Sequence, residues 1–293
     1  MDPLQPQSGI PGAPKPPTRR SDSEEAEALH PGQEFLLRLW TEYRTPLIGG
    51  LICLLAAAAL VTWLGQSREQ RLESAAMRLN RASVVYNQIV LNPQIDREAA
   101  DQLLTQVIQL CDMIREEYPG LEAAHMALFL KGSCHFERVY HYFGVVDNTV
   151  AREYLDQAIN AFRQYLDEAT DDLDEAQAII AIAACYENRS FLTDNPDLMT
   201  TAIEELGRAA QLAQGTYLEA QALMAQARCH EALDHRDEAR EIYQRVLQLR
   251  EPLAASISGG PFGLLLRSSG GFHELAQERL NRIESGVVAT PQS

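Results

Sequence analysis

The chain has 293 residues, which is enough for one or two domains with a buried core. Its formal net charge of -16 opposes contact with phosphate backbones, so we expect no nucleic-acid partner. The sequence contains no C-x-x-C pair, no glycine-rich nucleotide-binding motif and no G-x-S-x-G elbow, and it therefore gives no support to those kinds of catalytic site.

The N-terminal region divides into three parts. Residues 1–33 hold seven of the 14 prolines and are expected to be a disordered tail. Residues 34–45, beginning "EFLLRLW", form a short amphipathic juxtamembrane segment. Residues 46–65 are predicted to be a transmembrane helix, because no charged residue lies between Arg44 and Arg68.

The length of this apolar segment matches a bilayer. As a helix, Leu47 to Leu64 would span roughly 27 Å, close to a hydrocarbon core of about 30 Å. Trp40 and Trp63 lie near its two ends, where indole rings favour the interface. A buried core helix is the alternative. A cleaved signal peptide is disfavoured because a long tail comes first.

The sequence gives two opposing indications of the orientation of the span. We expect a cytoplasmic N-terminus and a domain outside the cytoplasm, since long domains cross largely regardless of charge. The local basic residues favour the opposite orientation: two precede the span closely and four follow it, namely Arg38 and Arg44, then Arg68, Arg71, Arg78 and Arg81.

Residues 66–255 have helical patterning interrupted by short breaks, and no stretch shows the alternation of a strand. A stalk over 67–91 leads into the first domain helix and is ended by Asn92-Pro93, and a second helix over 97–118 is ended by Tyr118-Pro119-Gly120. A Gly-rich loop follows over 256–271, either contacting a partner or tucked against the last helices. A capping helix over 272–284 and a frayed tail over 285–293 complete the chain.

Three pieces of the domain repeat one pattern: "KGSCHFE", "IAACYEN" and "QARCHEA". Each places a small residue two positions before a cysteine that is followed by a ring, at Cys134, Cys185 and Cys229. A second helix with small-x-x-x-large spacing follows each, and the distance between the two small residues is 26, 19 and 12 residues in turn. Steps of seven residues are close to two helical turns, which predicts longer helices around 137–150 and 187–200.

The last unit, over 220–252, resembles a tetratricopeptide repeat. The matching residue types are Ala227, His230, Leu233, Ala239, Tyr243, Val246 and Pro252. His230 replaces a larger aromatic, Asp234 stands where Gly is common, and Pro252 is one place late. The resemblance implies an all-α fold: a tetratricopeptide-like helical-hairpin solenoid preceded by one transmembrane helix.

The cysteines are interpreted as small core residues where two helices approach closely. His230 and His235 are five apart and cannot present a zinc pair as residues at i and i+4 do. We therefore expect binding rather than catalysis, with no cofactor and no metal. The alternative is a metal- or thiol-dependent enzyme that uses the three repeated cysteines and nearby histidines.

In the tetratricopeptide family the first helix of each pair forms a concave binding wall. Transferred by position, that wall comprises Phe129, Ser133, Phe136, Ile180, Ala184, Glu187, Met224, Arg228 and Glu231. It lacks the cluster of Lys, Arg and Asn with which family members hold a terminal carboxylate, which favours an apolar or helical ligand. Alternatively, the wall packs against the chain's own last helix. A second candidate patch, or padding of the first hairpin, is Tyr140, Tyr142 and Phe143.

The order of parts over 34–250 is similar to the ancillary Sec-translocon subunit of bacterial inner membranes. That resemblance implies an inner-membrane scaffold with a periplasmic repeat domain and with translocon or chaperone components as partners. The alternative is a cytoplasm-facing adaptor that recruits soluble proteins.

Overall fold

A computed structural model describes residues 31–92, 94–142, 148–249 and 271–285. These residues are helical or lie in short turns, and no strand occurs among them, which confirms the all-α class. The chain divides into two compact units, Met1–Leu64 and Gly65–Ser293.

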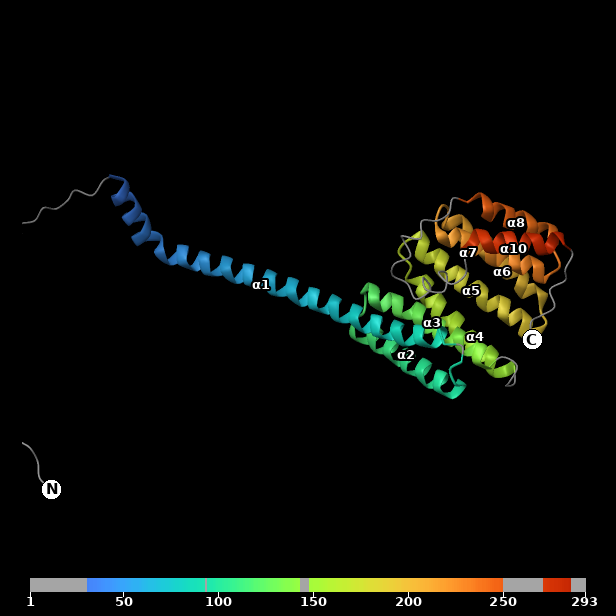
Figure 1. The fold of residues 1–293 in the computed structure, drawn as a ribbon. Coiled ribbons are helices and arrows are strands. Elements are labelled where there is room, and N and C mark those ends of the chain that lie inside the picture. The colour runs from blue at the N-terminus through green and yellow to red at the C-terminus, as the bar shows by residue number, and fades with distance from the viewer. Residues whose placement is uncertain (1–30, 93, 143–147, 250–270, 286–293) are drawn as a thin grey trace, which may run out of the picture. The chain divides into compact units, whose positions relative to one another are not determined.

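The helices follow one another with short connections (Figure 1). Their bounds are α1 Pro31–Val90, α2 Arg97–Glu117, α3 Glu122–Tyr142, α4 Asn148–Asp167, α5 Asp172–Thr193, α6 Pro196–Leu212, α7 Tyr217–Ala232, α8 Arg236–Gln248 and α10 Phe272–Glu284.

Helix α1 is continuous over the expected juxtamembrane segment, span and stalk. From Gly49 onward it is long and apolar enough to cross a membrane, by length and composition. Its large apolar side chains over 51–64 are exposed, and so are the indoles of Trp40 and Trp63. A soluble helix with this composition would bury at least one face, so the exposure is compatible with single-pass anchoring.

Local capping explains several helix boundaries. Asp96 and Asp171 each accept two backbone N–H bonds at the starts of α2 and α5. Asn195 caps α6, with Pro196 in the first turn. Asp234, which stands where the repeat family commonly has Gly, adopts a φ of 61°, so this turn does use the left-handed backbone that Gly favours.

Several expected boundaries are confirmed. Helix α2 ends beside Tyr118-Pro119-Gly120, and the last helix runs from Phe272 to Glu284. Helices α5 and α6 fill residues 187–200 except for a break at 194–195, and helices cover 137–142 and 148–150. Residues 1–30, Pro252, the Gly-rich loop up to 270 and the tail over 286–293 lie outside the described residues.

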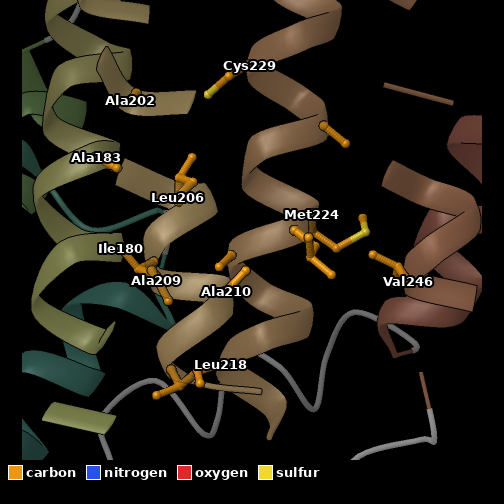
Figure 2. Close-up of a cluster of buried hydrophobic side chains, with 14 of the residues drawn as sticks. Ile180, Ala183, Ala202, Leu206, Ala209, Ala210, Leu218, Met224, Cys229 and Val246 are labelled. Carbon is orange, nitrogen blue, oxygen red and sulfur yellow. The ribbon is translucent and has the colours of Figure 1, made fainter. Parts of the chain in front are cut away.

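Within the second unit, consecutive helices from α2 to α8 pack side by side, and α10 packs on α8 and α7 (Figure 1). The buried side chains form three clusters. One joins α1, α2 and α3, a second joins α3, α4 and α5, and the third joins α5 to α8 with α10. Figure 2 shows part of the third cluster, in which Cys229 on α7 points toward Ala202 on α6.

The repeated cysteines are core residues, as their spacing predicts. Cys134, Cys185 and Cys229 are fully buried, and each belongs to a different cluster, so their sulfurs do not converge on one site. Cys111 on α2 is buried in the same way. Burial raises the pKa of the Cys111 and Cys229 thiols to about 12 and also raises those of Cys134 and Cys185.

This burial predicts the pattern of thiol reactivity. In the folded full-length protein at pH 8, the four buried cysteines should not react with a maleimide, because they are inaccessible and carry almost no thiolate. Denaturant should make all four reactive, as read by intact-mass spectrometry. Rapid native labelling of any buried cysteine would contradict the core assignment.

Candidate binding groove

Five of the nine wall residues line one cavity of about 100 Å³. Phe129, Ser133 and Phe136 come from α3, where spacings of four and three residues place them on one helix face. Ile180 and Ala184 come from α5. The structure therefore brings together the α3 and α5 parts of the predicted wall. We call this cavity and its lining the groove.

The sequence did not identify the rest of the groove. These residues are Tyr86 from α1, Phe162 from α4, Gln177 and Ala181 from α5, and Tyr217, Leu218 and Gln221 from α7. The additional residues on α5 and α7 lie on the same helix faces as the predicted wall residues. Spacing of three and four residues from those wall positions could have identified them. Tyr86 lies on a helix that the repeat pattern does not include. Phe162 is the large residue of the second helix in the first repeat, so neither belongs to the first helices from which the wall was predicted.

The chemistry of the groove is apolar. None of the described residues that line it carries a charge, and its rings include Phe129 and Phe162, whose centroids are 5.2 Å apart. The Ser133 hydroxyl donates to the Phe129 carbonyl at 2.9 Å, so its proton is already used. Burial raises the pKa of the Tyr217 phenol and keeps it neutral. Since an apolar cavity of about 150 Å³ can hold one benzene ring, this cavity of about 100 Å³ has room for one smaller apolar side chain.

A charged pair lies one turn beyond Ala184. Glu187 on α5 is buried, and Arg228 on α7 donates to it twice, from Nε at 2.8 Å and from Nη2 at 2.7 Å. A bidentate guanidinium–carboxylate pair fixes both partners in one geometry. These two wall residues therefore link α5 to α7. Each has the other as a charged partner, so neither charge depends on a ligand for its pairing.

The remaining wall residues on α7 contact the chain's own C-terminal helices. Met224 is buried in the third cluster and points toward Val246 on α8 (Figure 2). The Glu231 carboxylate accepts from Arg279 of α10 at 3.4 Å. Met224 and Glu231 therefore agree with the alternative prediction, in which the wall packs against the C-terminal part of the chain itself.

The second candidate patch lies at and beyond the C-terminal end of α3. Tyr140 and Tyr142 lie on the last turn of α3, but their side chains, like the whole of Phe143, are outside the described residues.

The histidines of the last repeat are close together, although they are five residues apart. The turn folds His235 back on His230, and their ring centroids are 5.8 Å apart. Desolvation lowers the pKa of His230. No group of three or more His, Cys, Asp or Glu side chains able to hold a metal ion occurs in the part of the chain that the structure describes.

No family model and no curated protein matches this chain. Among solved structures it is similar to the crystal structure of BtubC (BKLC) from P. vanneervenii, with 16% identity and a TM-score of 0.31, covering 77% of this chain and 95% of that one. A likeness of this strength carries no argument about function.

Proposed function

We propose that this chain is a single-pass membrane-anchored scaffold with a tetratricopeptide-like solenoid, and that its groove binds an apolar anchor residue of a partner protein. The observation that carries the proposal is the convergence of five predicted wall residues on one uncharged cavity. An apolar pocket of one side chain's volume that is partly open to the surface suits the anchor residue of a helical or extended segment.

Three features support the solenoid. Successive helices pack on their neighbours in chain order, as in proteins built from stacked hairpins. The first helices α3, α5 and α7 all contribute to one cavity. Asp234 adopts the backbone conformation expected at the family's glycine position. We further propose translocon or chaperone components at the bacterial inner membrane as partners, on the order of parts alone.

Blocking the groove tests the binding proposal. A photoreactive benzoylphenylalanine at Gln221 should form adducts with partner proteins in intact membranes, because this side chain lines the groove. Adding Ala184→Arg should remove most of these adducts, since a guanidinium would occupy the cavity and place a charge against aromatic rings. The yield is read by immunoblot.

The matched control is Phe191→Arg, which places the same side chain on the same helix at an exposed site outside the groove lining. It should leave the adducts unchanged, and circular dichroism should show both variants folded. Equal adduct yields in the two arginine variants would exclude the groove as the binding site.

A second orientation has a specific observation in its favour. Basic residues are more numerous just after the span than just before it, which supports a cytoplasm-facing adaptor over our proposal of an extracytoplasmic domain. External protease applied to intact spheroplasts separates the two. Digestion of the domain supports the extracytoplasmic scaffold, and protection until the membrane is permeabilised supports the adaptor.

A further inference from the structure

A second pocket lies between α3 and α4, on a different face of α3 from the groove. Its volume is about 240 Å³, and it is partly open to the surface. Leu128, Lys131 and His135 line it from α3 at spacings of three and four residues, about 130° around the helix from the α3 residues of the groove. We call it the α3–α4 pocket. It shares no lining residue with the groove and is therefore a separate site.

The α3–α4 pocket is polar, in contrast to the groove. The carboxamides of Gln157, Asn160 and Gln164 line it from α4, opposite the amine of Lys131 on α3. The Gln164 amide donates to the Asn160 oxygen at 3.3 Å, which leaves the N–H donors of Asn160 for a ligand. Among the described residues that line the pocket there is one positive charge and no carboxylate. This set of donors suits a ligand that is rich in acceptors.

His135 is the most buried polar residue of this lining. Its side chain belongs to a residue that is 7% exposed, and its Nδ1 is buried without a hydrogen-bond partner among the described residues. A buried polar atom without a partner costs free energy, which a ligand that bonds to it recovers. The χ2 torsion of histidine is soft, so the ring can turn Nδ1 toward a bound acceptor, and that acceptor selects the tautomer with the proton on Nδ1.

The charges around the pocket favour an anion of single charge. Lys131 donates to Asp112 of α2 at 2.6 Å, and because an ammonium has three N–H donors this bond does not exhaust them. Desolvation, and after it the positive charges of Arg138 and Lys131, lower the pKa of His135, while the Asp112 carboxylate opposes them. The field at the imidazole is therefore positive and attracts an anion. A dianion would bring more negative charge than one partly compensated ammonium balances.

We propose that the α3–α4 pocket binds a small organic monocarboxylate that also carries an amide or a hydroxyl group. Its carboxylate accepts from Lys131 and His135, which lie one turn apart on α3, and its amide or hydroxyl pairs with the carboxamides of α4. Since about 150 Å³ accommodates benzene, a pocket of about 240 Å³ has room for roughly ten non-hydrogen atoms. The site depends neither on the groove nor on the membrane anchoring.

Calorimetric titration of the full-length protein in detergent tests this site. The probe is N-acetyl-L-alanine, a monocarboxylate of this size with one amide, and we expect it to bind saturably. Its neutral methylamide and inorganic phosphate should each bind at least about tenfold more weakly. Lys131→Gln should weaken binding of the probe by at least about tenfold, because it removes a charge-assisted hydrogen bond. Arg208→Gln is the matched control. It removes a half-exposed cation that pairs with Glu175 outside the pocket, and it should leave binding unchanged.

Each other outcome would overturn the proposal. Absence of saturable binding to the unmodified protein would exclude the site. Equal affinity for the methylamide would exclude recognition of the carboxylate, and equal affinity for phosphate would mean an adventitious ion only. Unchanged affinity in Lys131→Gln, with a folded circular dichroism spectrum, would place the ligand elsewhere. Asn160→Leu changes an exposed residue of the same lining and should also weaken binding, so it decides the question if Lys131→Gln does not fold.

Discussion

Replacing Gly132 with alanine is expected to destabilise the folded domain by about 1–2 kcal/mol, although alanine is the better helix former. A Cβ at this position would lie 2.6, 2.7 and 2.9 Å from three atoms of the Phe162 ring. Forcing extra volume into a packed core costs about 1–3 kcal/mol, whereas the gain in helix propensity is about 0.5–1 kcal/mol. Urea unfolding of the full-length protein in detergent measures the difference.

The ring cannot move aside easily. Phe162 is buried on α4, and its ring also meets Phe129 with centroids 5.2 Å apart. Its displacement would therefore disturb the groove as well as the hairpin. Because the clash depends on one partner, Phe162→Leu should be less costly in the Gly132→Ala background than alone. Such non-additivity is expected for residues in contact.

Gly65→Ala is the matched control. Gly65 is also in a helix, but a Cβ there would have no neighbour within 4 Å, so no loss of stability is expected. A fall in stability with Gly65→Ala equal to that with Gly132→Ala would show that the effect does not come from the close helix contact.

Gly132 also illustrates what a repeat pattern can predict. The repeat pattern places a small residue at Gly132, Ala183 and Ala227, and a large residue of the second helix at Phe162. Their positions in the structure agree with that reading, since Gly132 and Phe162 lie in contact. Local periodicity is sufficient here because each hairpin packs mainly on its neighbours in the chain.

Features that depend on distant packing were not accessible in this way. Tyr86 reaches the groove from a helix that the repeat pattern does not include. Met224 occupies a wall position by spacing, yet it is buried within the third cluster. Glu231 is held by Arg279, 48 residues further along the chain, and no local signal predicts that pairing. The sequence therefore predicted the helix faces, but not which parts of them the last helix occupies.

His135 is expected to make the domain acid-sensitive in a defined pH range. Its ring on α3 is 7% exposed, and its Nδ1 is buried without a hydrogen-bond partner. Desolvation lowers the pKa of His135 from 6.5 to about 4. The positive charges of Arg138 and Lys131 act in the same direction, and the Asp112 carboxylate opposes them.

The sign of the effect follows from proton uptake. Between pH 6.5 and about 4 the unfolded chain protonates this imidazole and the folded chain does not, so stability falls as the pH is lowered through that range. At about 1.4 kcal/mol per pKa unit the full shift corresponds to roughly 3 kcal/mol. We expect about 2 kcal/mol, because water that reaches the ring edge screens part of it.

Comparing His135→Gln with the unmodified protein isolates this contribution. Urea unfolding at pH 7, 6, 5 and 4.5 should show a shallower loss of stability for the variant. Carboxylates titrate in both proteins, so the difference between the two curves is the quantity to measure. His235→Gln makes the same replacement at an exposed ring in the turn before α8 and should change the pH dependence less than His135→Gln does. Parallel curves for His135→Gln and the unmodified protein would mean that the folded state accepts the proton at His135 as readily as the unfolded chain does.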